Sequence, residues 1–207
     1  MYIHRTLFLC CLALLCLATP QLAAQRDDRP RKKNKPPRTF AAGQVDLHLT
    51  LGVLPTYFAD RKRSTQGLPA LYASTDYRLS QRFSLGAFYG RSNAETDEYV
   101  FSDGVRGSWQ NRTQVYGLRA LLHFDAVPKS QLYGGFSVGQ SRTLVNCDNP
   151  TMLRMERYMG IGRDTDKLIY SALFGGRYQL NSRLAAVGEL EAGGISLVRL
   201  GLSVRLF

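Results

Sequence analysis

The sequence has few acidic residues, few cysteines and no long hydrophobic run. Its longest apolar run, Leu7–Ala18, has 12 residues and is too short to cross a bilayer as a helix, which excludes a polytopic helical membrane protein. The 16 acidic residues are outnumbered by 27 Lys and Arg, giving a formal net charge of +11. This balance favours an anionic neighbour such as nucleic acid, phospholipid head groups or lipopolysaccharide. Apolar residues still make up 44% of the chain, which excludes disorder for most of it.

The apolar run lies where a secretory signal peptide has its hydrophobic core. His4 and Arg5 precede it and Ala23-Ala24 follow it, an arrangement that predicts cleavage after Ala24. We therefore expect residues 1–24 to be a signal peptide. Of the four cysteines, only Cys147 would remain, which excludes an intramolecular disulfide and a four-cysteine metal site in the mature chain.

Residues 25–42 form a basic, proline-rich segment. Seven Lys and Arg stand against two Asp, and three prolines interrupt regular structure. We expect a disordered leader, and the alternative is a polybasic arm that rests on anionic lipid or glycan. Export makes nucleic acid an unsuitable partner, and none is expected.

From residue 43 onward, apolar residues recur at every second position. In 44–53 the odd positions are all apolar and the even positions are Gln, Asp, His, Thr and Gly, which is the pattern of a strand with two different faces. The same test predicts seven more strands, near 69–80, 83–92, 113–124, 131–142, 168–180, 184–192 and 196–206. We therefore expect residues 43–207 to form one eight-stranded domain.

The connections between these strands alternate in length. Those at 59–68, 93–112 and 143–167 are long, whereas those at 81–82, 125–130 and 181–183 are short. Short periplasmic turns and long extracellular loops are typical of outer-membrane barrels. This alternation predicts an all-β, eight-stranded antiparallel up-and-down transmembrane β-barrel.

The non-apolar face of the strands carries charges of both signs, which suit a small polar lumen where they can pair. Aromatic residues bracket the apolar stripes, as Tyr116 and Phe124 do. Eight residues at about 3.3 Å each and a tilt of about 40° rise roughly 20 Å, close to the lipid-facing band of such barrels. A soluble lipocalin-like lipid carrier, with its apolar face inward, is the structural alternative. The predicted lumen residues are Asp46, His48, Asp76, Arg78, Arg119, His123, Arg177, Glu189, Glu191, Arg199 and Arg205.

The last hairpin allows a prediction of register. Both strands place apolar residues at even numbers, so paired residues must have numbers with an even sum. A three-residue loop at 193–195 then pairs Glu189 with Arg199 and Leu190 with Val198, and its glycines suit the left-handed conformation that such a loop requires.

Signal peptide, eight alternating strands, alternating loop lengths and a C-terminal Phe207 together resemble the small outer-membrane β-barrels of the OmpA-transmembrane and OmpX type. The phrases Leu85-Gly86-Ala87-Phe88-Tyr89-Gly90 and Tyr133-Gly134-Gly135-Phe136 are similar to strands of that family, and Gln25 after the signal resembles exported proteins of the Bacteroidota. The resemblance implies recognition by the barrel-assembly machinery through the last strand and Phe207. One departure is that Phe207 has an odd number, whereas the apolar face of the last strand has even numbers.

Candidates for catalysis are few. Outer-membrane lipid A acyl hydrolases resembling this fold use a His/Ser pair, and the mature chain offers His48 near Thr50 and His123 near Asp125. Neither set supplies nucleophile, base and orienting acid. We expect no enzymatic activity and no cofactor, with a lipid-modifying enzyme as the alternative function.

The segment 143–167 is the most distinctive connection. Asn149-Pro150 can begin a short helix and Gly160 can end it. Met152, Met155 and Met159 near Cys147 would suit a soft metal such as Cu(I), but their spacing also gives one apolar face for packing or partner contact. We favour the second interpretation and expect no metal. Together with Trp109, the only tryptophan, these methionines are the predicted contact residues of the long loops.

The sequence therefore predicts a monomeric, non-enzymatic outer-membrane barrel with a structural or surface-contact role through loops 93–112 and 143–167. Outer-membrane lipid and lipopolysaccharide are its expected partners.

Overall fold

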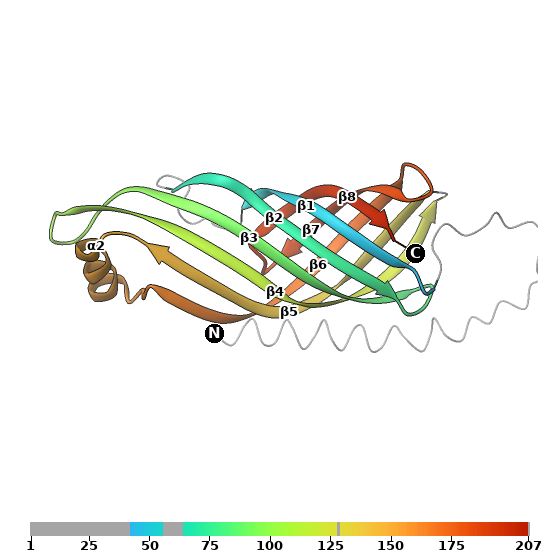
Figure 1. Cartoon of the computed structure of the whole chain (residues 1–207), viewed down its shortest axis with the longest axis horizontal. Helices are drawn as coiled ribbons and strands as arrows, with labels where there is room; N and C mark the ends of the chain where they lie inside the picture. Colours follow the sequence, from blue (N-terminus) through green and yellow to red (C-terminus); the bar gives the residue numbers. More distant parts are fainter. Residues whose placement is uncertain (1–41, 56–63, 128, 207) are drawn as a thin grey trace, which may run out of the picture. The chain divides into compact units, whose positions relative to one another are not determined.

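The computed structural model describes residues 42–55, 64–127 and 129–206, and the expected signal peptide, nearly all of the leader, and Phe207 lie outside these ranges. Eight strands form one closed, antiparallel barrel in the order of the sequence (Figure 1). Among the described residues, no helix is both long and apolar enough to cross a membrane. The elements are β1 (Val45–Pro55), β2 (Ser64–Arg78), β3 (Phe83–Val100), β4 (Arg106–Val127), β5 (Ser130–Asn146), α2 (Asn149–Arg154), the π-helix η2 (Met155–Met159), β6 (Asp164–Gln179), β7 (Leu184–Ala192) and β8 (Ser196–Arg205).

The barrel wall has apolar residues outside and mostly polar residues inside. In β1, Asp46, His48 and Thr50 are buried, whereas Leu49 and Leu51 are exposed. The period-two pattern of the sequence thus places its apolar set on the outer surface, the reverse of a water-soluble barrel. The interior also holds apolar clusters, one of which is formed by Leu121, Tyr133, Leu173 and Val187.

The register of the last hairpin is the predicted one. Glu189 pairs with Arg199 and Leu190 pairs with Val198. Gly193 in the connecting loop has φ of 99°, the left-handed region that glycine adopts without strain. β8 then closes the barrel against β1, with Asp46 opposite Arg205.

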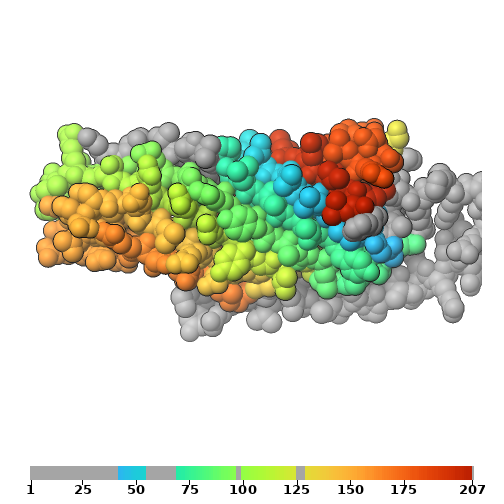
Figure 2. All heavy atoms as spheres, viewed as in Figure 1, coloured from blue at the N-terminus to red at the C-terminus, as the bar shows by residue number. Residues whose placement is uncertain are grey.

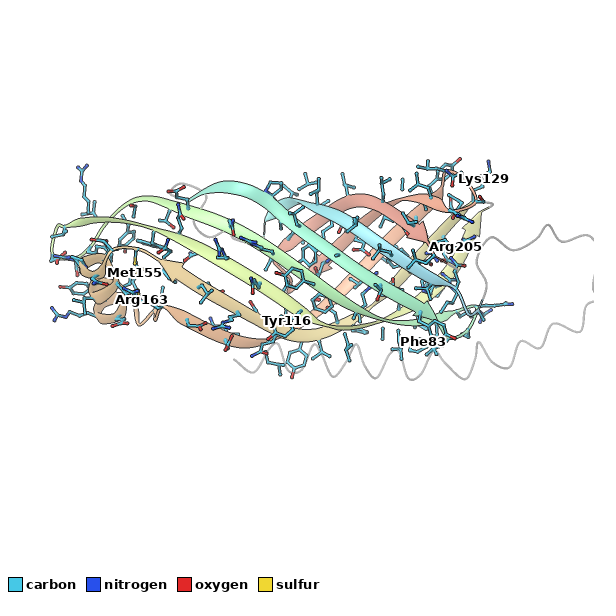
Figure 3. The ribbon with its side chains drawn as sticks, viewed as in Figure 1. Phe83, Tyr116, Lys129, Met155, Arg163 and Arg205 are labelled. Atoms are coloured by element: carbon cyan, nitrogen blue, oxygen red, sulfur yellow. The ribbon has the colours of Figure 1, made fainter. Side chains whose placement is uncertain are left out.

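The connections at one end of the barrel are tight turns. The Asn181 side chain accepts hydrogen bonds from the backbone N–H groups of Arg183 and Leu184 at 2.9 and 2.8 Å, and Ser80 accepts one from Phe83 at 3.1 Å. These local bonds satisfy the backbone where the ladder stops. Figure 3 shows Phe83, Lys129 and Arg205 near this end, opposite Met155 and Arg163.

At the other end, the strands are longer than the sequence predicted. The expected loop 93–112 is an extended hairpin, because β3 runs to Val100 and β4 begins at Arg106. The expected loop 143–167 holds the end of β5, both helical segments and the start of β6. The alternation weakens there because the outward positions become polar, while the backbone ladder continues. The loop boundaries inferred from alternation were therefore wrong.

The longer strands lie on one side of the barrel only. Ladder pairing continues from β3 through β6, whereas β6 pairs with β7 only from Ala172 to Gln179. Residues 164–168 of β6 thus have a ladder partner in β5 only, among the described strands. Figures 1 and 2 show the ends of β3 to β5 and the helix α2 gathered together beyond the shorter strands. We call this part, residues 93–112 and 142–167, the distal extension.

Candidate functional site

The barrel interior near the tight turns is organised around the buried amide of Gln131. Arg78 and Arg177, from β2 and β6, each donate from Nη2 to Gln131 Oε1, at 2.7 and 2.6 Å. Arg177 also donates from Nη1 to Asp46 Oδ2 at 2.6 Å. The uncharged side chain of Gln131 therefore bridges two guanidinium groups. The charge of Arg177 is balanced by Asp46 of β1.

The middle of the interior is organised around two carboxylates. Arg119 donates to both oxygens of Asp76, from Nε to Oδ1 at 2.7 Å and from Nη2 to Oδ2. Its Nη1 lies 3.4 Å from Glu189 Oε1, which also accepts a hydrogen bond from Tyr133 Oη at 2.8 Å. Arg199 Nη2 lies 2.7 Å from the other oxygen of Glu189. Bidentate, charge-assisted bonds of this kind are the strong ones in proteins.

Toward the distal extension, the polar network ends at an apolar layer. Arg199 Nη1 lies 3.0 Å from Glu191 Oε2, and its guanidinium carbon lies 4.2 Å from the centre of the Tyr72 ring. Tyr72 Oη accepts a hydrogen bond from the Ile195 backbone at 3.1 Å. The layer above is formed by the buried residues Ala70, Tyr72, Phe88, Val115 and Ile195. Side chains therefore fill the lumen both in the polar network and in the apolar layer beyond it.

The structure places the predicted lumen residues on the interior face. Ten of the eleven are buried, and Arg205 is partly buried on the same face of β8. Four carboxylates and four guanidinium groups among them are buried, so the formal charge of these eight buried groups is zero. The sequence did not single out Gln131 and Tyr133, although their positions on the interior phase of β5 were a usable signal.

Both histidines are buried in the barrel interior. His48 Nε2 lies 2.9 Å from Asp76 within the interior network. His123 Nε2 lies 2.7 Å from Ser84 Oγ, a contact that resembles a nucleophile and its base. However, His123 Nδ1 faces the Arg78 guanidinium at 3.4 Å, where an orienting carboxylate would be needed. Because Ser84 and His123 are both buried, a lipid substrate could not reach them.

The distal extension has a small core of its own. We call it the distal cluster, and its members are the buried Phe101, Trp109, Val145 and Met155, with Tyr99, Cys147 and Met159 partly buried against them. Trp109 lies edge to face with Tyr99, with ring centroids 5.7 Å apart. Trp109 is 8% exposed and Met152 4%, so these two predicted contact residues pack inward and do not form a surface for a partner.

α2 and η2 cover one side of this cluster. Gly160 ends η2 with φ of 64°, as the sequence predicted, and Arg154 ties α2 to the β3–β4 turn through a 2.8 Å ion pair with Asp103. The hydrogen bond from Arg154 holds the pKa of the Asp103 carboxyl below its ordinary value. The predicted contact residue Met155 is fully buried, and Met159 is partly buried. Figure 3 labels Met155 at the end of the molecule where α2 lies.

A basic group faces outward where the extension leaves the barrel. Arg91 and Arg142 lie on either side of Gln114, immediately beyond the aromatic pair Tyr89 and Tyr116. Arg112 is the next outward-facing residue of β4 after Gln114, on the side of the β3–β4 turn. A hollow of 520 Å³ lies beside Arg112 and is lined by Asn93, Glu95, Gln110 and Asn146 among others. Arginines and amides above an aromatic belt can bind phosphate and sugar groups.

A closed eight-stranded barrel with an apolar exterior and a charged interior defines the architecture of the small outer-membrane β-barrels. The chain is similar to the crystal structure of the outer membrane protein OprG from Pseudomonas aeruginosa, with a TM-score of 0.55 and 11% identity over 81% of this chain and 97% of that one. A second similar structure is Neisserial surface protein A, NspA, with a TM-score of 0.44 and 17% identity over 80% of this chain and 97% of that one. No protein-family model and no curated protein matches the sequence. The likeness to OprG shows the fold.

Proposed function

We propose that the protein is a non-enzymatic integral barrel of the bacterial outer membrane that presents the distal extension at the cell surface. The observation that carries this proposal is the apolar outer wall. Leu118 and Leu168 are each 64% exposed, and Leu49 is 58% exposed. Exposed apolar surface of this extent is unfavourable in water and is stabilised by hydrocarbon.

Aromatic residues mark two edges of this apolar band. In β4, Tyr116 and Phe124 are exposed and eight positions apart, and in β6 the same is true of Tyr170 and Tyr178. Side chains with an apolar body and a polar end concentrate at the two membrane interfaces. The equal spacing in two strands supports a bilayer-spanning band between these residues.

Lipopolysaccharide is the partner that the outward arginines support. Arg91, Arg112 and Arg142 follow the upper aromatic edge on adjoining strands, at the height where anionic head groups lie. Arg142 is also hydrogen-bonded to Asp164 at 3.1 Å, which holds the pKa of that carboxyl below its ordinary value. We infer that this group contacts the phosphates of the outer leaflet.

A surface-contact role is supported by the free side of β6. Residues 164–168 pair with β5 and, among the described strands, have no ladder partner on the other side. An edge strand offers its backbone groups to an extended segment of another protein. Asp164, Asp166 and Lys167 are exposed along it, and such charges limit indiscriminate pairing.

The two alternatives are less well supported. A lipid-modifying enzyme would require a reachable nucleophile, and the Ser84–His123 contact is buried beside an arginine. A soluble lipid carrier would require an apolar cavity, and in the described residues the interior holds ion pairs and packed side chains. A monomeric state, the signal peptide and recognition of Phe207 by the assembly machinery remain part of the proposal.

Cell fractionation with gel electrophoresis of boiled and unboiled membranes tests this proposal. The expected result is a band in the outer-membrane fraction that migrates differently after boiling, because a folded barrel resists detergent unless it is heated. A soluble protein without a heat-modifiable band would refute the membrane location. Lipid A analysis after expression is the second measurement, and loss of an acyl chain that depends on Ser84 would refute the non-enzymatic assignment.

A further inference from the structure

The sulfur-containing residues of the expected mature chain converge in one place. The sequence has four methionines, and all except Met1 lie between positions 152 and 159, close to Cys147. In the structure, Met155 belongs to the distal cluster, and Cys147 and Met159 pack against it. Three thioethers and one thiol are thus collected at the end of the distal extension, over strands β3 to β5.

Two of these sulfur atoms have the separation of ligands that share a metal ion. Cys147 Sγ lies 3.7 Å from Met152 Sδ. Two ligand sulfurs about 2.3 Å from a common ion lie about 3.8 Å apart at the tetrahedral angle and about 4.0 Å apart at the trigonal angle. The thiol proton lies between the two sulfurs in the metal-free protein, so an ion would take its place without a large movement of the chain.

The helical geometry directs the other two thioethers toward the same core. Met152 and Met155 are three positions apart in a continuous helical segment and are both buried. Met159 is four positions further along η2, which has more residues per turn than an α-helix and so keeps Met159 on this side. Leu153 on the outer side is 66% exposed, which confirms the orientation of the helix.

Although the sequence alone favours a packing role for these residues, we propose that Cys147 and Met152, with Met155 or Met159 as third ligand, bind a soft monovalent cation of the Cu(I) or Ag(I) type. Thiolate and thioether sulfur are the ligands that such ions prefer, whereas Zn²⁺ favours thiolate, imidazole and carboxylate. Among the described residues, no group of three or more His, Cys, Asp and Glu gathers where it could hold a metal. The donor set therefore favours a soft ion of low charge.

Binding is a substitution of a proton by the metal ion. In the metal-free protein the Cys147 thiol donates a hydrogen bond to the Met152 sulfur, so the proton that the ion replaces is the thiol proton. The incoming cation forms a sulfur–metal bond, the S–H bond breaks, and the proton leaves to water. Cys147 is partly exposed, which gives the ion access from solvent. No change of oxidation state is involved.

Metal binding can be followed by the fluorescence of Trp109, the only tryptophan of the sequence. Trp109 lies in the distal cluster with Met155, so an ion bound there is expected to quench its emission. The full chain, refolded in detergent under argon, is titrated with silver nitrate in chloride-free buffer, and Cu(I) affinity is measured anaerobically by competition with bicinchoninate. The expected result is saturation at one ion per chain, together with a thiolate-to-metal absorption band.

Substitutions of matched size separate metal binding from packing. Met152→Leu keeps the apolar volume and is expected to weaken Ag(I) and Cu(I) binding at least tenfold, and Cys147→Ser at least a hundredfold. Leu153→Met adds a thioether on the exposed side of the same helix and is expected to leave affinity unchanged. Heat-modifiable mobility and metal-free Trp109 emission verify that each variant is folded.

Three outcomes would overturn the proposal. Wild-type affinity in both Met152→Leu and the double variant Met155→Leu/Met159→Leu would mean that the ion binds the thiol alone. Titration without saturation at one equivalent would mean that no defined site exists. Displacement of silver by an equal concentration of Zn²⁺ would mean that the site has no preference for soft ions.

Discussion

The barrel interior and the distal cluster are two cores of opposite chemistry within the same strands. In the barrel, β4 turns Arg119 inward and Leu118 outward, whereas in the extension it turns Trp109 inward and exposes Ser108 and Gln110. The strand is continuous and its side-chain period does not change. The difference shows that the surroundings decide which face is apolar: hydrocarbon around the barrel, water around the extension.

The change of polarity gives a physical measure of where the membrane ends. On the outer face of β4, Leu118 and Tyr116 are followed toward the turn by Gln114 and Arg112. On the inner face, Val115 belongs to the apolar layer that closes the lumen. We therefore place the upper boundary between Tyr116 and Gln114, and the following predictions test the contrast on its two sides.

The largest loss of unfolding free energy is expected when a carboxylate is removed from the barrel interior. Glu189→Leu removes the counter-charge of Arg119 and Arg199, and breaking a buried pair costs about 3–5 kcal/mol. Urea unfolding in lipid vesicles, followed by gel mobility, should show this loss in unfolding free energy. Glu95→Leu in the exposed part of β3 is the matched control, and an equal loss there would contradict the contrast.

A charge introduced on the outer face of β4 should lower the unfolding free energy strongly only on the membrane side of the boundary between Tyr116 and Gln114. Ala120 lies four positions from each of Tyr116 and Phe124 on the outer face of β4, and Ala120→Arg is expected to cost about 2–4 kcal/mol at this depth. Ser108→Arg places the same side chain on the same face of the same strand in the extension, where about 1 kcal/mol or less is expected. The same urea experiment compares them. Similar values for both would place β4 in one medium throughout.

Opening the distal cluster should have a local effect. Trp109→Ala leaves a cavity among Phe101, Val145 and Met155, and truncation of a large buried side chain costs about 3–5 kcal/mol where it cannot be refilled. We expect faster proteolysis and faster hydrogen exchange within 93–112, with the urea midpoint of the barrel unchanged. A lowered midpoint would mean that the two cores unfold as one unit.

The smallest effect concerns the ion pair that ties α2 to the β3–β4 turn. Because the pKa of Asp103 is lowered in the folded chain by the hydrogen bond from Arg154, its contribution is present above the ordinary pKa of about 4 and is lost as the pH falls through the folded value. Proteolysis of the turn should therefore accelerate below about pH 4. In Asp103→Asn the rate should already be raised at pH 6 and should depend less on pH; an unchanged profile would exclude a role for this pair.

The part of the fold that the sequence predicts is the part that contacts lipid. Leu49 and Asp46 alternate because one face meets hydrocarbon and the other meets the lumen, so strand positions and the Glu189–Arg199 register follow from residue parity. In the extension, water wets the outer face, and polar residues such as Asn93 and Arg112 no longer distinguish a strand from a loop. The ladder there is specified by backbone pairing with strands that only the fold brings together.

The same reasoning explains which interior residues could be predicted. Charged residues on the inner phase, such as Arg177, are evident because a charge facing lipid would be costly. Gln131 carries no charge, and its role as the acceptor for two arginines depends on β2 and β6 approaching it from both sides. The burial of Trp109 likewise depends on β5 and η2, which are remote in sequence.

The interior ion pairs also constrain how the barrel can form. Arg177 on β6 pairs with Asp46 on β1, Arg119 on β4 pairs with Asp76 on β2, and Arg119 reaches Glu189 on β7. None of these three pairs joins adjacent strands, so a sheet assembled strand by strand cannot make them before it curls. An open sheet would present these charges to lipid without their partners, at a cost of several kcal/mol for each ion. Curling and membrane insertion are therefore coupled, and closure of the barrel brings each of these buried charges to its partner on a distant strand.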